Sequence, residues 1–196
     1  MRPSLILLPG WGLGNAPLQP LAAALADQAQ VAIEPLPAFE HADSERWLDA
    51  LDERLPRGVW LGGWSLGGML ATLLAARRGA DCPGLLTVAS NARFTASEGW
   101  PAAMPAATFE AFREAYALNP AATLKRFAIL CSQGAVDFRG LSRRLLEQAD
   151  GSDSLAGLGL LAALDTREAL QQFSGPQLHL FAADDALVPA AAVVAI

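Results

Sequence analysis

The chain has 196 residues, of which 53% are hydrophobic and 17% are charged, and its formal net charge is −6. This length and composition can bury one sizeable core, which excludes an intrinsically disordered chain. The negative charge gives no overall attraction to nucleic acid or to an anionic membrane, so we expect neither as a partner. No apolar run reaches the ~18 residues of a membrane span, and the one near the start is too short for a secretory signal. We therefore expect a cytoplasmic protein.

The two cysteines, Cys82 and Cys131, lie far apart in the sequence, without a CxxC motif and without a neighbouring histidine. This spacing predicts neither a zinc site nor a disulfide framework. We expect two buried free thiols, and no metal or other cofactor.

Short apolar segments bounded by glycine or proline alternate along the chain with segments of helical periodicity. The predicted strands are Ser4–Leu8, Gln30–Glu34, Gly58–Gly62, Gly84–Ser90 and Gln177–Ala182. The predicted helices between them are Leu18–Ala29, Ser44–Leu55 and Gly68–Arg78. This order predicts an α/β fold, a mostly parallel sheet with helices on both faces.

From about Phe94 to Leu164 the alternation stops and helical periodicity takes over. The predicted helices here are Thr108–Leu118, Ala121–Ser132, Phe138–Ala149 and a glycine-interrupted stretch around Leu155–Leu164. We therefore divide the chain into a first part of the α/β core (1–93), a helical insertion (94–165) and a second part of the core (166–196). We expect the insertion to fold over the strand ends as a lid.

An apolar strand runs into Gly-X-Ser-X-Gly at Gly63–Gly67 and then into a predicted helix. This is the order of a nucleophile elbow, in which a strained serine projects above the sheet at the positive end of a helix. The bare pattern occurs by chance in roughly one chain in fifteen of this length, so the strand and helix around it carry the argument. Ser65 is therefore the predicted nucleophile.

A glycine-rich turn, Pro9–Gly14, follows the first predicted strand. It lies where an α/β-hydrolase supplies its first oxyanion donor, and we expect the backbone N–H groups of Trp11 and Leu66 to form the pair. The turn also resembles part of a dinucleotide-binding fingerprint, but the third glycine is missing because Pro17 stands in its place.

The loop after the last predicted strand contains Asp184 and Asp185, where the fold places its triad acid. We favour Asp185 over Asp184. Neither histidine has the position of a general base, because His41 precedes the nucleophile and His179 lies within a strand before the acid. We expect these 196 residues alone to be nearly inactive, and a longer chain to supply the base.

Taken together, these motifs resemble the pimeloyl-acyl-carrier-protein methyl ester esterases of biotin synthesis, a family with the α/β-hydrolase fold. The matching segments are Leu7–Leu13, Trp60–Gly68, Thr87–Ser90, Glu98–Pro101, Lys125–Phe127 and Asp185–Pro189. One departure is Pro9, which stands where many relatives have a histidine. The resemblance implies a serine carboxylesterase that releases methanol from the methyl ester of a pimeloyl chain on acyl carrier protein, and also cleaves short acyl esters.

The resemblance also implies residue roles. Ser65 would be the nucleophile, Asp185 would orient the missing histidine, and Trp11 and Leu66 would donate to the oxyanion. Phe127 would line the acyl channel, although a role in the lid core is equally plausible.

Basic residues gather in the predicted insertion. Twenty residues carry a local charge of +4, from Asp137 and from Lys125, Arg126, Arg139, Arg143 and Arg144. Such a patch would attract the acidic carrier protein and pair with its phosphopantetheine phosphate, and Arg126, Arg139 and Arg143 match the family's carrier-contacting positions. The alternative is a solvated helix face.

Two other functions stay open from the sequence. Another lidded α/β-hydrolase, such as a lactonase or a cofactor-free haloperoxidase-like enzyme, would share the elbow and the lid. A non-catalytic protein of this fold could instead bind an acyl carrier or a ligand. Epoxide hydrolases and haloalkane dehalogenases are disfavoured, because their nucleophile is an aspartate.

Overall fold

The computed structural model describes residues 2–147, 149 and 154–196. A five-stranded sheet with the strand order β2-β1-β3-β4-β5 forms its centre, and every neighbouring pair is parallel. The strands are β1 (Ser4–Leu8), β2 (Gln30–Ile33), β3 (Trp60–Trp64), β4 (Leu85–Val88) and β5 (Gln177–Leu180). The predicted parallel sheet is confirmed, with strand ends that differ by a few residues.

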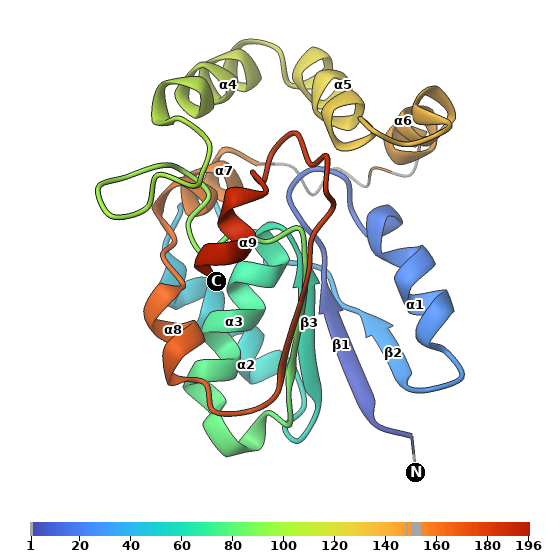
Figure 1. The fold of residues 1–196 in the computed structure, drawn as a ribbon, viewed down its shortest axis with the longest axis vertical. Helices are drawn as coiled ribbons and strands as arrows, with labels where there is room; N and C mark the ends of the chain where they lie inside the picture. The colour runs from blue at the N-terminus through green and yellow to red at the C-terminus, as the bar shows by residue number, and fades with distance from the viewer. Residues whose placement is uncertain (1, 148, 150–153) are drawn as a thin grey trace.

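Helices connect the strands and form the region between β4 and β5 (Figure 1). The helices of the core are η1 (Ala16–Leu18), α1 (Gln19–Leu25), α2 (Ser44–Arg54), α3 (Leu66–Arg78), η2 (Gly79–Asp81), α8 (Arg167–Gln172) and α9 (Ala191–Ala195). Between β4 and β5 the chain forms α4 (Ala106–Leu118), α5 (Pro120–Cys131), α6 (Phe138–Glu147) and α7 (Leu155–Ala163). The four helices predicted in that region are present, although residues 148 and 150–153 lie outside the described part.

The first predicted helix, Leu18–Ala29, differs most from the structure. The chain first makes the short helix η1 and then α1, which ends at Leu25. Pro17 and Pro20 are the second residues of η1 and α1, within the first turn, where the missing N–H of proline costs nothing. The short helix α8 was not predicted from the sequence.

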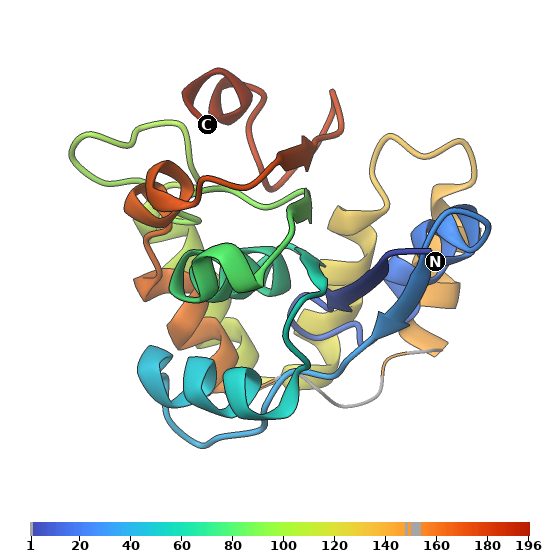
Figure 2. The same cartoon turned by 90° about the horizontal axis from the view of Figure 1, so that it is seen from below.

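The sheet separates two hydrophobic cores, and Figure 2 shows α1 on one side with α2 and α3 on the other. The larger core joins alternate residues of β1 and β3, such as Ile6 and Leu61, to α2 and α3. The smaller core joins Leu5, Leu7 and Leu86 to α1. This alternation buries both faces of the central strands, as expected for a parallel sheet.

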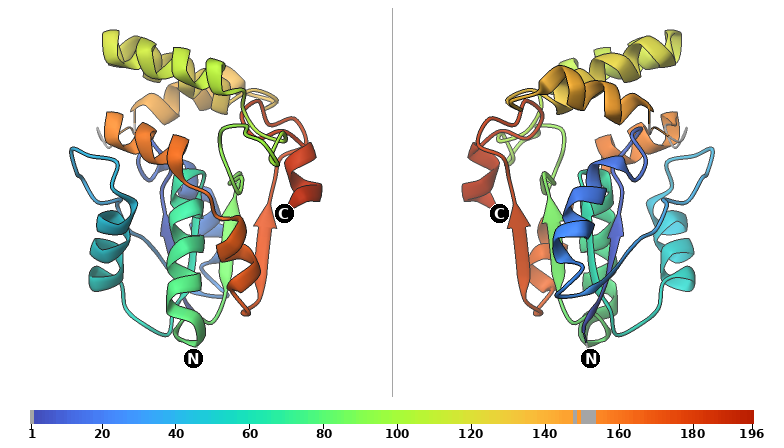
Figure 3. Two further views of the ribbon diagram at one scale, coloured as in Figure 1. Left: turned by 90° about the vertical axis from the view of Figure 1, so that its left-hand side faces the viewer. Right: turned by 90° about the vertical axis from the view of Figure 1, so that its right-hand side faces the viewer.

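Helices α4, α5 and α6, which we call the cap, lie across the carboxyl ends of the strands (Figures 1 and 3). The chain enters and leaves this region side by side, because Arg93 and Asp165 form an isolated antiparallel bridge. The Ala92 carbonyl accepts hydrogen bonds from the Thr166 N–H at 2.8 Å and from the Thr166 hydroxyl at 3.1 Å. The cap therefore stands over the end of the sheet where β3 passes into α3.

Across the described residues, no helix is long and apolar enough to cross a membrane.

Candidate active site

Ser65 lies at the sharp turn between β3 and α3. It has a φ of 53° in the left-handed region, which strains a residue with a side chain, and it is the N-cap of α3. Its backbone is held on both sides, because its N–H donates to the Val88 carbonyl at 3.0 Å and its carbonyl accepts from the Ser90 hydroxyl at 2.9 Å. The serine is thus fixed at the N-terminus of a 13-residue helix.

The glycines around Ser65 allow the strand, the helix and the turn after β1 to approach closely. A methyl group on Gly67 would collide with the carbonyl oxygens of Leu8 and Pro9. A methyl group on Gly63 would collide with the backbone of Gly67. The first turn of α3 therefore packs directly against the end of β1.

This contact brings the two predicted oxyanion donors to the same end of the sheet. Leu66 is the first residue of α3, where a backbone N–H has no acceptor within its own helix. Trp11 follows the Leu8–Pro9 segment that Gly67 contacts, and the residue is only 2% exposed. The Trp11 indole N–H donates to the Ser154 carbonyl at 2.8 Å, which fixes the turn.

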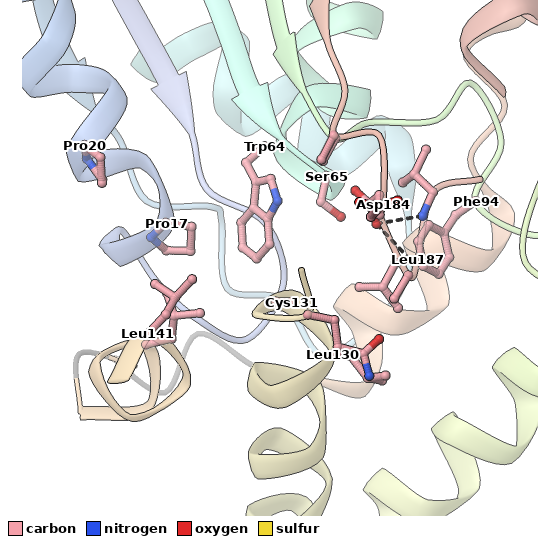
Figure 4. Close-up of a pocket in the computed structure, with 17 residues that line it drawn as sticks. Pro17, Pro20, Trp64, Ser65, Phe94, Leu130, Cys131, Leu141, Asp184 and Leu187 are labelled. Carbon is pink, nitrogen blue, oxygen red and sulfur yellow. Dashed lines mark hydrogen bonds between the residues drawn. The ribbon is translucent and has the colours of Figure 1, made fainter. Parts of the chain in front are cut away.

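A pocket of about 370 Å³ opens over Ser65. Figure 4 shows Trp64 between Ser65 and a group formed by Pro17, Pro20 and Leu141. On the other side of Ser65 the pocket is lined by residues of the loop after β4, of α5 and of the loop after β5, namely Phe94, Leu130, Cys131, Asp184, Asp185, Leu187 and Val188. The pocket therefore combines one hydroxyl and two carboxylates with mostly apolar walls.

Asp184 and Asp185 both line this pocket but are held differently. The Asp185 carboxylate oxygen Oδ1 accepts from the N–H groups of Leu187 at 2.8 Å and Val188 at 3.0 Å, and the residue is half-buried. Asp184 is exposed, and no hydrogen bond or ion pair is found for its carboxylate among the described residues. The loop thus fixes one carboxylate and leaves its neighbour in solvent.

Neither histidine of the chain lines the Ser65 pocket. His41 is exposed in the loop before α2. His179 lies in β5, where its Nδ1 is 2.7 Å from the Thr87 hydroxyl, and burial lowers its pKa. Both imidazoles therefore lie outside the lining of the pocket that contains Ser65.

The two thiols differ from each other. Cys82 is buried and donates to the Gly84 carbonyl at 3.3 Å, as expected of a thiol in the core. Cys131 is only half-buried and lines the Ser65 pocket, so the prediction of two buried thiols is wrong for Cys131. The loss of water around the sulfur, and then the charge of Asp185, raise the pKa of the Cys131 thiol although part of the residue is exposed. Both thiols are free, and the described residues contain no cluster of side chains suited to a metal ion.

Phe127 of α5 is 8% exposed and lies between the two tryptophans of the site. Its ring centroid is 5.3 Å from that of Trp11, in an edge-on contact, and 6.5 Å from that of Trp64, in a stacked contact. It also lines a second, smaller cavity of about 80 Å³ beneath the cap. Phe127 is therefore both a core residue of the cap and part of a cavity wall.

The basic residues of the cap lie on its exposed surface. Lys125, Arg139 and Arg143 line a groove of about 420 Å³ between α5 and α6, together with Ile129 and Phe138. Arg126 is exposed but does not line this groove. Arg143 lies 3.9 Å from Glu147, and Arg144 lies 3.6 Å from Asp137. Part of the positive charge of the cap is therefore paired with its own acids, and Lys125 and Arg139 are the further basic residues that line the groove.

Sequence reasoning missed residues that hold the nucleophile. Ser90 binds the Ser65 carbonyl, and Ala89, with a φ of 45°, is a second strained residue in the pocket wall. Their position at the end of the predicted strand Gly84–Ser90, at the edge of the sheet where the site forms, was the available signal. The contact of Gly67 with the end of β1 joins segments more than fifty residues apart and left no local signal.

Similar sequences come from enzymes of biotin synthesis, although no family profile matches the chain. The chain is 35% identical to the pimeloyl-[acyl-carrier protein] methyl ester esterase of Vibrio cholerae, over 95% of the chain and 77% of that protein. For the esterase of the same name from Aromatoleum aromaticum, the identity is 36% over 97% of the chain and 83% of that protein. The chain is also 40% identical to the biotin biosynthesis bifunctional protein BioHC of Cellvibrio japonicus, but spans only 40% of its length.

Solved structures with the same fold are also hydrolases. An esterase from Exiguobacterium antarcticum matches with a TM-score of 0.81 at 17% identity, covering 98% of this chain and 78% of that one. A thermophilic esterase from Thermogutta terrifontis matches with a TM-score of 0.75 at 20% identity, covering 100% of this chain and 76% of that one. These likenesses establish the α/β-hydrolase fold, and the sequence identities establish the family: the chain belongs to the pimeloyl-[acyl-carrier protein] methyl ester esterases.

Proposed function

We propose that the protein is a serine carboxylesterase that hydrolyses the methyl ester of a pimeloyl chain carried on acyl carrier protein. The observation that carries this proposal is the position of Ser65. It is a strained residue at the N-terminus of α3 and lines a pocket that also contains a fixed carboxylate. A serine held in this way meets the requirements of a nucleophile elbow.

In the proposed reaction, the Ser65 hydroxyl attacks the ester carbonyl carbon while a histidine base takes its proton. The N–H groups of Leu66 and Trp11 stabilise the negative charge on the carbonyl oxygen, and the positive end of α3 adds to this field. Collapse of the tetrahedral intermediate expels the alcohol, which receives the proton. Water then attacks the acyl-enzyme by the same steps and releases the acid.

Asp185 is the acid in this proposal, and its role is to orient the base. Its Oδ1 already accepts two backbone hydrogen bonds, which set the direction of the carboxylate and leave Oδ2 for an imidazole N–H. Asp184 lacks such support. The proposal needs a histidine base, which neither His41 nor His179 supplies from its place in this structure, so the assays use the protein as the cell produces it.

The cap, with the rest of residues 94–165, acts as a lid in this proposal. It covers the strand ends, and α5 and α6 contribute Leu130, Cys131, Leu141 and Leu145 to the pocket wall. The outer surface of the same helices carries Arg126, Arg139 and Arg143. An acidic carrier protein would be attracted to these charges, and its phosphopantetheine phosphate would pair with an arginine. Small soluble esters need only the pocket.

The test is to replace Ser65 by alanine in the full-length protein and to assay p-nitrophenyl esters of short acids. The unmodified protein is expected to hydrolyse them, and Ser65→Ala is expected to lose all turnover that depends on the nucleophile. Ser97→Ala is the matched control, because it also replaces a serine by alanine but the Ser97 hydroxyl makes only an exposed hydrogen bond and Ser97 does not line the Ser65 pocket, so turnover should be retained. Retained turnover in purified Ser65→Ala protein would exclude Ser65 as nucleophile.

A further inference from the structure

Two cavities share a wall, and Ser65 lines the larger of them. The first is the pocket of about 370 Å³ that contains Ser65 and the two carboxylates. The second is the cavity of about 80 Å³ beneath the cap, between Trp11 and α4. Phe94, Leu130 and Leu187 line both cavities and so form the wall between them.

This wall lies close to the reacting groups. Leu187 donates its N–H to the Asp185 carboxylate, so the small cavity begins directly behind the acid loop. Trp11, whose backbone is a proposed oxyanion donor, lines the small cavity with its side chain. Phe127 closes the cavity from α5 and contacts both Trp11 and Trp64. A group bound there would lie against the acid loop and against the turn that carries the Trp11 N–H.

The volumes of the two cavities limit what each can hold. A cavity of about 150 Å³ holds benzene, which has six carbons, so a cavity of about 80 Å³ has room for roughly three. A seven-carbon pimeloyl chain cannot enter it. The pocket over Ser65 is more than four times larger and continues past Trp64 to Pro17, Pro20 and Leu141.

The linings of the cavities also differ. The small cavity is lined by aromatic, aliphatic and methionine side chains, with Thr108 as its one hydroxyl-bearing residue. A short alkyl group gains from such a site, whereas a chain that leads to a charged carrier would lose its connection to solvent. The arm past Trp64 instead follows Leu141 and Leu145 on the inner side of α6, whose outer side bears Arg139 and Arg143.

From this arrangement we infer that the small cavity is the alcohol-side subsite, which receives the methyl group of the ester, and that the arm past Trp64 receives the acyl chain. Phe112 of α4 is then a specificity-determining residue. It is half-buried, its ring lies edge-on to Trp11 at 5.7 Å, and it forms part of the cavity wall. The inference rests on the proposed function. The acyl chain must take the arm past Trp64 only if that chain is attached to a carrier protein outside the pocket.

The test compares kcat/KM for methyl, ethyl, propyl and butyl esters of hexanoic acid. Phe112→Ala enlarges the small cavity, and we expect it to raise the butyl-to-methyl ratio of kcat/KM about tenfold or more, the effect of relieving methylene groups that do not fit. Met104→Ala enlarges the same cavity from a half-buried position and should act in the same direction if Phe112→Ala does not fold.

The control is Phe39→Ala, which removes another half-buried phenylalanine that lies edge-on to a tryptophan, 6.0 Å from Trp47 and outside the cavity. It should leave the ratio unchanged. Leu141→Trp tests the other subsite, because a larger side chain narrows the arm past Trp64. We expect it to lower turnover of methyl octanoate relative to methyl acetate. The preference among alcohols should not change.

The outcomes separate the inference from the function on which it rests. If folded Phe112→Ala and Met104→Ala keep the butyl-to-methyl ratio of the unmodified protein within twofold, the small cavity is not the alcohol subsite. If they change the acyl-length preference instead, the two subsites are exchanged. If the unmodified protein hydrolyses none of these esters, the proposed esterase function itself fails.

Discussion

The two sides of the Ser65 pocket are held in place by different forces. On the sheet side, Ser65 and the first turn of α3 are fixed by backbone contacts, where glycines let Gly67 touch the end of β1. On the cap side, Phe112 and Phe127 pack on Trp11, and the two ends of the inserted segment are joined to each other through polar groups. The Asp165 carboxylate accepts from Arg93 at 3.0 Å and from Arg167 at 2.7 Å. Steric packing has no dependence on salt or pH, whereas ion pairs depend on both.

This difference suggests a division of labour, with chemistry on the sheet side and recognition on the cap side. Changes on the sheet side should then affect all esters alike, because every substrate would meet the same proposed nucleophile and oxyanion donors. Changes in the cap should affect only those substrates, or those conditions, that act on the cap. The following experiments test this division.

The largest effect is expected at the acid. Asp185→Asn should lower kcat about 10⁴-fold for small and carrier-bound esters alike, because an amide holds the wrong imidazole tautomer and cannot stabilise imidazolium. Asp184→Asn is the matched control, since the neighbouring carboxylate lines the same pocket and should cost little. Equal losses, or a larger loss at Asp184, would contradict the choice of Asp185 as the acid.

A somewhat smaller effect is expected at the elbow. Gly67→Ala would force the first turn of α3 away from Leu8 and Pro9 and so displace the N–H of Leu66. Loss of one oxyanion donor costs about 10²–10³ in kcat, and we expect a loss of that size for every ester. Gly159→Ala in α7 is the control, because its added methyl group also collides with a neighbour, the Ala42 side chain, but outside the Ser65 pocket, and it should leave kcat unchanged. If Gly67→Ala protein is folded and fully active, the elbow does not depend on this contact.

On the cap side, acid should loosen the attachment at Asp165. The hydrogen bond from Arg167 is the main cause that lowers the pKa of Asp165, and Arg93 adds to it. A carboxylate with a depressed pKa contributes stability that is complete above its ordinary pKa, near 4, and is lost as the pH falls towards the folded value.

Asp165→Asn should therefore lower the melting temperature at pH 7, and the difference from the unmodified protein should shrink below about pH 4. Thermal unfolding followed across this pH range is the measurement. Asp49→Asn is the control, because its ion pair with Arg77 involves a carboxylate that is 67% exposed and should contribute little. A difference that is constant with pH would mean that Asp165 acts through packing alone.

The smallest and most selective effect is expected at the cap surface. Reversing Arg139 and Arg143 to glutamate should weaken turnover of a carrier-bound methyl ester about tenfold and leave a small soluble ester almost unchanged. Raising the salt concentration should reproduce part of this defect in the unmodified protein, because exposed charges are screened over a Debye length of about 8 Å at physiological ionic strength.

Replacing Arg2 and Arg54 by glutamate is the matched control for net charge, because both arginines are exposed and lie outside the cap. It should leave both substrates unaffected. A parallel loss for both substrates in the Arg139 and Arg143 variant would make those side chains structural, and no change would make them a solvated helix face.

The local parts of this molecule were predictable from the sequence. The sheet and the strand-to-helix turn at Ser65 were found because alternating apolar segments and a glycine-flanked serine are read within a few residues of each other. Gly63 and Gly67 marked the turn, and the structure agrees within two residues at the ends of β3 and α3.

The long-range parts were not predictable. The joining of Arg93 to Asp165 and Arg167 brings together charges about seventy residues apart, and no periodicity records such a pairing. The same is true of the small cavity between Trp11 and α4, because a cavity depends on how imperfectly several helices pack. The sequence indicated that Phe127 lies in the acyl channel or in the cap core, and the structure places it in the cap core and in the wall of the small cavity.

Cys131 has a consequence for the chemical resistance of the pocket. Its pKa is raised, first by the loss of water around the sulfur and then by the negative charge of Asp185, so at neutral pH the thiol keeps its proton. The thiolate is the form that reacts with alkylating agents and peroxides, and a thiol that rarely ionises is slow to be alkylated or oxidised. We therefore expect iodoacetamide and hydrogen peroxide to leave the pocket open, while organophosphates aimed at Ser65 close it. A hydrolase of this construction would keep working under oxidative stress that inactivates enzymes with a cysteine nucleophile.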